Sequence, residues 1–164
     1  MGDIEKNLRP YQSCLKFEQT PSSPIISVWL NELKELSVKE QLDHLRIGEI
    51  VFIHLDSSKG LSYYRGGTND WIVKISRWEV ELPLTFGHEL GHILVARDEE
   101  ILCLPPKLTT PLAAWEKRGV RHEVEENLCE EFGKAWSAVE RNTMESLQLF
   151  RDLSNRNIKK SGIY

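Results

Sequence analysis

The sequence predicts a single α+β domain, in which a small antiparallel sheet of about three strands packs with a helix carrying the motif HExxH and with a long C-terminal helix. Apolar residues recur at helical spacing early in the chain, short aromatic and β-branched runs occupy its middle, and helical spacing then resumes. The length of 164 residues suits one domain, and a content of 40% hydrophobic and 28% charged residues is ordinary globular usage. We therefore expect one domain over residues 1–164, with 1–23 and 155–164 peripheral or flexible.

Two helices are expected before the sheet. Ser23 followed by Pro24 is typical of a helix start, and apolar residues follow at helical spacing. Ser37 has the character of an N-cap, so it predicts a second, short helix that reaches Leu45. Gly48 is expected to end that helix.

Three strands are expected in the middle of the chain. Runs from Glu49 to Leu55, from Leu61 to Tyr64 and from Trp71 to Ile75 are rich in β-branched and aromatic residues. The separators, 56–60 and 66–70, are rich in Ser, Gly, Asn and Asp, which favour tight turns. These features predict an antiparallel meander.

The second half of the chain is expected to be helical. Helical spacing runs from Thr85 to Arg97 and again from about Arg121 to Leu153. Pro105, Pro106 and Pro111 lie between these segments, so we expect a long irregular loop there. Loops of such length inside a small domain are often functional.

Composition argues against several classes of protein. A net charge of -4 without a basic face is unlike a nucleic-acid-binding protein, so no direct nucleic-acid partner is expected. Three cysteines without CxxC spacing or a preceding signal segment indicate the reducing cytoplasm. No apolar run approaches the roughly 20 residues that span a bilayer, so no membrane association is expected.

The residues His88, Glu89 and His92 form an HExxH motif within the predicted helix. At about 100° per residue, the two histidines lie on one helix face one turn apart, so both imidazoles can reach one metal ion. Glu89 projects from an adjoining position, where its carboxylate can accept a proton from a water molecule at the metal. The motif therefore predicts two ligands for one zinc ion and a general base.

A catalytic zinc ion needs a third protein ligand and an open fourth position. Metzincin proteases would carry Gly at position 95 and His at position 98, but this chain has Val95 and Asp98, which excludes that class. The later helix offers five acids instead: Glu123, Glu125, Glu126, Glu130 and Glu131.

Helical periodicity narrows this choice without settling it. Glu126 shares one face with the small residues Cys129 and Gly133, and that face can lie close to another helix. Gly87 and Gly91 on the HExxH helix permit the same close approach. Spacing alone leaves Glu126 open against its acidic neighbours, since acidic runs are usually solvated.

Two segments carry a resemblance to a known family. Leu84 to His92 reads LTFGHELGH, and Glu126 to Gly133 reads ENLCEEFG. Together they resemble the ImmA/IrrE metallopeptidases, in which an FTLAHELGH-like segment is followed by a helix of the form Glu-x-x-(Ala/Cys)-(Asn/Asp)-x-Phe-Ala. The order of elements is similar over roughly residues 26 to 140, which implies a zincin-like fold.

The resemblance implies residue roles and a function. His88, His92 and Glu126 would bind one Zn²⁺ ion, and Glu89 would be the catalytic base. The chain would then be a zinc-dependent endopeptidase that cleaves a regulatory protein such as a helix-turn-helix repressor. The alternatives are a non-catalytic regulatory protein stabilised by its metal, and a hydrolase of small amides.

The chain departs from the family pattern at two positions. Glu130 replaces the usual Asn or Asp, and Gly133 replaces the usual Ala. Glu130, one turn after Glu126, can accept a hydrogen bond from a ligand histidine, although a solvated acid is an equal alternative. Arg77 resembles a basic residue that often precedes the motif in the family.

Three further side chains are candidates for stabilising an oxyanion, because each can donate a hydrogen bond if it folds near the metal. Nothing in the sequence selects among them. They are Tyr63, Tyr64 and His122.

Overall fold

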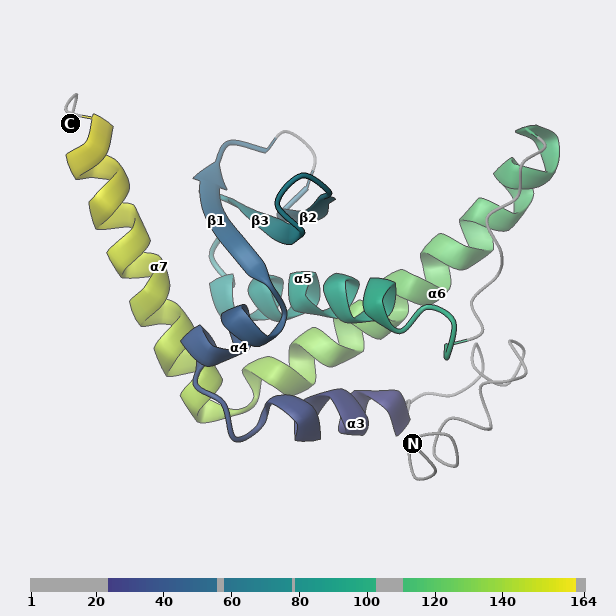
Figure 1. The fold of residues 1–164 in the computed structure, drawn as a ribbon, viewed down its shortest axis with the longest axis horizontal. Coiled ribbons are helices and arrows are strands. Elements are labelled where there is room, and N and C mark those ends of the chain that lie inside the picture. The colour runs from purple at the N-terminus through teal and green to yellow at the C-terminus, as the bar shows by residue number, and fades with distance from the viewer. Residues whose placement is uncertain (1–23, 56–57, 78, 103–110, 162–164) are drawn as a thin grey trace.

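The computed structural model describes residues 24–55, 58–77, 79–102 and 111–161, and within them it shows five helices and one three-stranded sheet (Figure 1). The predicted α+β class is confirmed. The elements in chain order are α3 (Pro24–Leu33), α4 (Val38–His44), β1 (Ile47–Ile53), β2 (Gly60–Arg65), β3 (Asp70–Ser76), α5 (Leu82–Arg97), α6 (Pro111–Ser137) and α7 (Glu140–Ser161).

The two early helices begin where the sequence predicts. Helix α3 starts at Pro24, whose fixed φ suits the first turn of a helix. Helix α4 has Ser37 as its N-cap: the Ser37 hydroxyl accepts from the backbone N–H of Glu40, and the Glu40 carboxylate accepts from the N–H of Ser37. This capping box satisfies two backbone donors that the helix itself leaves unpaired.

The end of α4 differs from the prediction. Arg46, with φ 60°, rather than Gly48 makes the left-handed turn after the helix, and β1 already begins at Ile47. Gly48 has a different role, because a Cβ at this position would overlap the carboxylate of Asp70 on β3. Glycine at this position leaves room for the Asp70 carboxylate, which accepts two hydrogen bonds from the guanidinium of Arg65.

The predicted antiparallel meander is wrong. The strand order is β1-β3-β2, with β1 parallel and β2 antiparallel to β3, so the sheet is mixed. A central strand is paired on both edges and is the most buried, and β3 meets that requirement with Ile72, Val73 and Ile75. The middle strand in sequence, β2, exposes Leu61 and Tyr63 and therefore lies at the edge.

Helix α5 lies at the centre of the molecule. The sheet covers one side of it, while α3 and α6 lie on the other side, and α7 rises steeply at one end (Figure 1). Because it is surrounded, α5 buries residues on most of its circumference. The largest fully buried side chains of the core are Trp29, Trp136, Phe86, Phe132, Phe150, Ile25, Leu33, Ile75, Leu90, Ile93 and Leu94.

Helices α5 and α6 approach each other through small residues, as predicted. A Cβ added to Gly91 would lie 3.0 Å from the Cα of Cys129, and one added to Gly133 would lie 2.9 Å from the backbone nitrogen of His88. Both distances are shorter than ordinary van der Waals contact. The glycines therefore let the two helix backbones touch beside the HExxH motif.

The described residues 111–161 form two helices instead of the single one expected from 121 to 153. Helix α6 ends at Ser137 and α7 begins at Glu140. Side chains of the first turn of α7 satisfy the last carbonyls of α6: Asn142 donates to the oxygen of Trp136, and Thr143 donates to that of Ser137. These bonds replace helical ones, so the chain turns without a Gly or Pro.

Helix α6 also begins earlier than predicted. It starts at Pro111, so residues 111–120 are helical where a loop was expected. Proline is tolerated in the first turn because its missing N–H would have no helical partner there. The remainder of the predicted loop, 103–110, lies outside the described residues, as does the segment 1–23.

A buried polar network joins α4 to the turn between α6 and α7. The indole of Trp136 donates to the side-chain oxygen of Gln41 at 2.8 Å, and the amide nitrogen of Gln41 donates to Asn142 at 3.0 Å and to the backbone oxygen of Leu36 at 3.1 Å. Gln41 is fully buried, so these bonds replace its lost hydration.

Within the described part of the chain, no helix has both the length and the apolar character to span a bilayer.

Candidate metal centre

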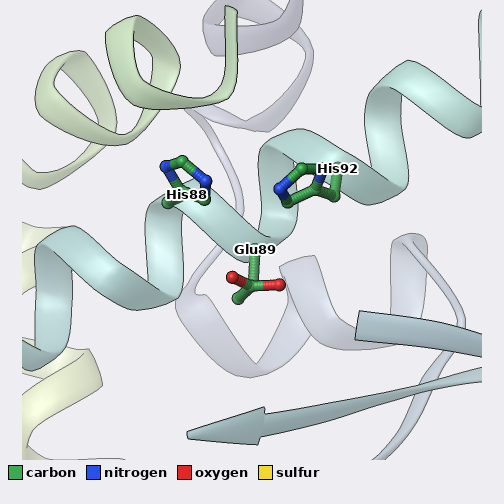
Figure 2. Close-up of side chains that lie close together, drawn as sticks. All are labelled: His88, Glu89 and His92. Atoms are coloured by element: carbon green, nitrogen blue, oxygen red, sulfur yellow. The ribbon is translucent and has the colours of Figure 1, made fainter. Parts of the chain in front are cut away.

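His88 and His92 project from one side of α5, one helical turn apart (Figure 2). Their ring centroids are 5.0 Å apart, and both side chains are mostly buried. The neighbouring residues Leu90 and Leu94 are fully buried and anchor this part of the helix in the core. The histidine pair predicted from the motif is therefore presented by a rigid element.

Glu126 of α6 completes the cluster. One oxygen of its carboxylate lies 3.0 Å from Nε2 of His88, and the other lies 3.0 Å from Nε2 of His92. Among the five acids that spacing left open, Glu126 is the one that meets both imidazoles through their Nε2 atoms. The helix contact at Gly91 and Gly133 causes this convergence, because it brings α6 against the histidine face of α5.

The three side chains suit a zinc ion by their chemistry and spacing. Two imidazole nitrogens and one carboxylate are a common ligand set for catalytic zinc. Ligands at about 2.0 to 2.1 Å from a tetrahedral ion lie roughly 3.3 Å from one another. The nitrogen-to-oxygen distances of 3.0 Å at Glu126 need only a small expansion to reach that value.

Glu89 projects from α5 towards the strands, beside the histidine face (Figure 2), and ligand atoms of Glu89, His88 and His92 all lie within 4.8 Å of one another. It is only 4% exposed, its carboxylate accepts a hydrogen bond from the side chain of Ser62, and it lies close to Gly60 on β2. Burial raises the pKa of Glu89, while the positive charge of His92 and the Ser62 hydrogen bond partly oppose the rise. A carboxylate with a raised pKa is a stronger proton acceptor than one in water.

The cluster opens into a pocket of about 860 Å³. The edge strand β2 forms one wall and α6 forms another, with the histidines and Glu89 between them. The lining residues include Lys59, Gly60, Leu61, Ser62, His88, Glu89, His92, Glu99, His122, Glu125 and Glu126.

The two histidines have opposite pKa shifts. Burial and the neighbouring charge of His92 lower the pKa of His88. Burial also disfavours charge on His92, but its hydrogen bond to Glu125 and the surrounding carboxylates outweigh burial and raise its pKa. A neutral imidazole is the form that binds a metal, so zinc has to compete with a proton chiefly at His92.

Glu125 is the residue that sequence reasoning missed. Its carboxylate lies 2.6 Å from Nδ1 of His92, on the other ring nitrogen from Glu126. For Glu130 the sequence left two alternatives open, a hydrogen bond to a ligand histidine or an exposed acid; Glu130 is exposed and pairs with Lys134 at 3.3 Å, which agrees with the second. The signal in the sequence was weak, because five acids follow one another on this helix with similar spacing.

Cys129 lies behind the site and is fully buried. Donor atoms of His92, Glu125 and Cys129 all lie within 4.8 Å of one another, as do those of His88, Glu89 and His92. Burial raises the pKa of the Cys129 thiol well above its usual value. The protonated thiol behaves as a small apolar side chain that packs against Gly91.

The remaining candidates differ in position. His122 lines the pocket, one turn before Glu126 on α6. Tyr63 is exposed beneath the ammonium of Lys74, and the hydroxyl of Tyr64 donates to Asn69 in the β2–β3 turn. Arg77 is exposed after the end of β3. Of the three oxyanion candidates, the structure thus brings His122 to the pocket.

Comparison of this chain with protein families, curated proteins and solved structures found no match.

Proposed function

We propose that the protein is a zinc-dependent endopeptidase of the cytoplasm. The observation that carries this proposal is the meeting of His88, His92 and Glu126 beside an open pocket, where each imidazole Nε2 lies 3.0 Å from one oxygen of the Glu126 carboxylate. A purely structural zinc site is usually closed by four protein ligands, whereas three ligands in a pocket leave a position for water or substrate.

The buried base supports a hydrolytic role. When bound, zinc supplies a Lewis acid that polarises a carbonyl group and makes water more acidic. Glu89 accepts the proton of the attacking water and returns it to the leaving amine. Its burial serves this task, because burial raises the pKa of the Glu89 carboxyl and so makes its carboxylate a stronger proton acceptor.

The edge strand supports a peptide as the substrate. Among the described strands, β2 pairs with β3 alone and so lies at the edge of the sheet, and residues 59 to 62 line the pocket. The outer edge of such a strand presents N–H and C=O groups to which an extended peptide can add. A peptide bound there would pass beside Glu89, whose carboxylate already contacts β2.

We propose a helix-turn-helix repressor as the protein substrate. This choice comes from the resemblance of the His88 and Glu126 segments to ImmA/IrrE metallopeptidases. A separate regulatory protein as the substrate agrees with the net charge of -4, which gives this chain no general attraction to nucleic acid.

The substitution Glu89→Gln tests the proposal. It removes the base while keeping the size and polarity of the side chain, so we expect stoichiometric zinc and an intact fold. Cleavage of the repressor encoded nearest to the gene should fall by at least about 100-fold. Glu100→Gln, the same change at an exposed residue after α5, is the matched control and should cleave normally.

Each alternative gives a different result. Regulation that persists in Glu89→Gln would favour a non-catalytic, metal-stabilised binding protein, since a structural site needs no base. Hydrolysis of small amides without cleavage of any protein would favour a small-molecule hydrolase. Measurements of zinc content by atomic absorption and of cleavage products by mass spectrometry distinguish these cases.

A further inference from the structure

The imidazole of His92 is held on both of its ring nitrogens by adjacent residues of one helix. Glu125 approaches Nδ1 at 2.6 Å and Glu126 approaches Nε2 at 3.0 Å. Both carboxylates come from the same turn of α6, so the ring lies between two negatively charged groups. Of these two carboxylates, Glu126 also contacts His88, through Nε2 of that ring.

We propose that Glu125 is a positioning residue that orients His92 for the metal. Its carboxylate accepts a hydrogen bond from Nδ1–H and so leaves the lone pair of Nε2 directed towards the ion. The bond also fixes the rotation of the ring and makes Nε2 a better donor to a cation. This inference rests on the proposed function, because it assigns Glu125 to the same metal centre.

The packing of α5 on α6 explains why Glu125 takes this place. Gly133 contacts the backbone of His88, and Cys129 contacts that of Gly91, so the two helices run in opposite directions at this contact. One turn before Cys129, the chain of α6 reaches His92 with Glu125 and Glu126 together. Glu130 lies beyond this crossing and faces Lys134 instead.

Glu125 can also be read as a ligand itself, in a cluster with His92 and Cys129. That cluster would use Nδ1 of His92, on the far side of the ring from His88 and Glu126. It would also need a thiolate from Cys129, which is fully buried. The convergence of both Nε2 atoms on Glu126 therefore favours a positioning role for Glu125.

The experiment measures the zinc affinity of the full chain by competition with a chromophoric chelator. We expect Glu125→Ala to weaken zinc binding by about 10- to 100-fold, as removal of such a partner typically does. Glu125→Gln should lose less, since its amide oxygen still accepts from Nδ1–H. Glu123→Ala is the matched control: it removes one exposed carboxylate of the same helix that does not line the pocket, and it should bind zinc like the wild type.

A second readout follows the ring directly. In ¹⁵N NMR of the zinc-loaded protein, Nδ1 of His92 should carry a proton in the wild type, with a shifted resonance in Glu125→Ala. Circular dichroism of each variant verifies that the helices remain. Equal zinc affinity in Glu125→Ala and Glu123→Ala would overturn the role of Glu125 while leaving the proposed enzyme intact.

Two other results would also overturn the inference, and they separate it from the proposed function. A wild-type chain that binds no zinc would refute both. A cobalt-loaded protein with a thiolate-to-metal charge-transfer band, lost in Cys129→Ser, would place the ion on the Nδ1 side of His92 and make Glu125 a ligand.

Discussion

Gly133→Ala tests whether the contact between α5 and α6 builds the site. Alanine is normally the better helix former by about 1 kcal/mol, so an exposed glycine in α6 would be improved by this change. Here the added Cβ would lie 2.9 Å from the backbone nitrogen of His88 and 3.0 Å from the backbone oxygen of Leu84. Backbone atoms cannot rotate away, so the helices have to separate.

The expected magnitude follows from these opposing effects. Overpacking of a close helix contact costs about 1 to 3 kcal/mol and exceeds the gain in helix propensity. We expect a net loss of about 1 kcal/mol in the free energy of unfolding, or a melting temperature lower by about 2 to 4 °C for a chain of this size. The separation also moves Glu126 away from the histidines, so zinc affinity should fall with stability.

The assay is urea unfolding of the metal-free protein, followed by zinc titration of the same variant. Gly67→Ala is the control, because a Cβ there meets nothing within 4 Å. A Gly133→Ala protein that is more stable than the wild type and binds zinc equally well would refute the reasoning. That result would show that alanine, the residue expected here from the family resemblance, fits after all.

Two further predictions concern the metal-free protein. The pKa of Glu89 is raised above 4.5 in the fold, so stability is fully present below that pH and is lost as the pH rises through the raised value. Glu89→Gln should therefore unfold at higher urea than the wild type at neutral pH but at a similar urea concentration at pH 4, and a gap that does not depend on pH would contradict this. Gln41→Leu leaves the indole N–H of Trp136 and the amide oxygen of Asn142 without their hydrogen-bond partner. The free energy of unfolding should fall by about 1 to 3 kcal/mol for each buried group. Gln148→Leu, on the exposed face of α7, is the control. A urea midpoint of Gln41→Leu no lower than that of this control would refute the predicted loss of stability.

Short-range features could be predicted from the sequence because their physical causes are local. The cap at Ser37 needs only its neighbour Glu40, and the HExxH spacing places His88 and His92 on one face of any helix. The small-residue faces of α5 and α6 were also visible in the order of amino acids. These features predicted the start of α4, the histidine pair and the close approach of α5 and α6.

Other features depend on contacts between segments that are distant in sequence. Strand order followed from the burial of β3 against α5, since turn residues between strands do not reveal which strand lies in the centre. The break between α6 and α7 depends on side-chain hydrogen bonds from Asn142 and Thr143. The helical periodicity of the sequence does not predict such bonds.

The acids of α6 show the same limit at the candidate site. The amino-acid order alone determined that a pair of histidines and a nearby carboxylate would share α5, and that an acidic helix would follow. Only the tertiary structure decided that Glu126 meets both Nε2 atoms, that Glu125 holds Nδ1 of His92, and that Glu130 faces Lys134. The physical reason is that residues one position apart on a helix differ by about 100° in direction, so the crossing of two helices selects which carboxylate reaches which nitrogen.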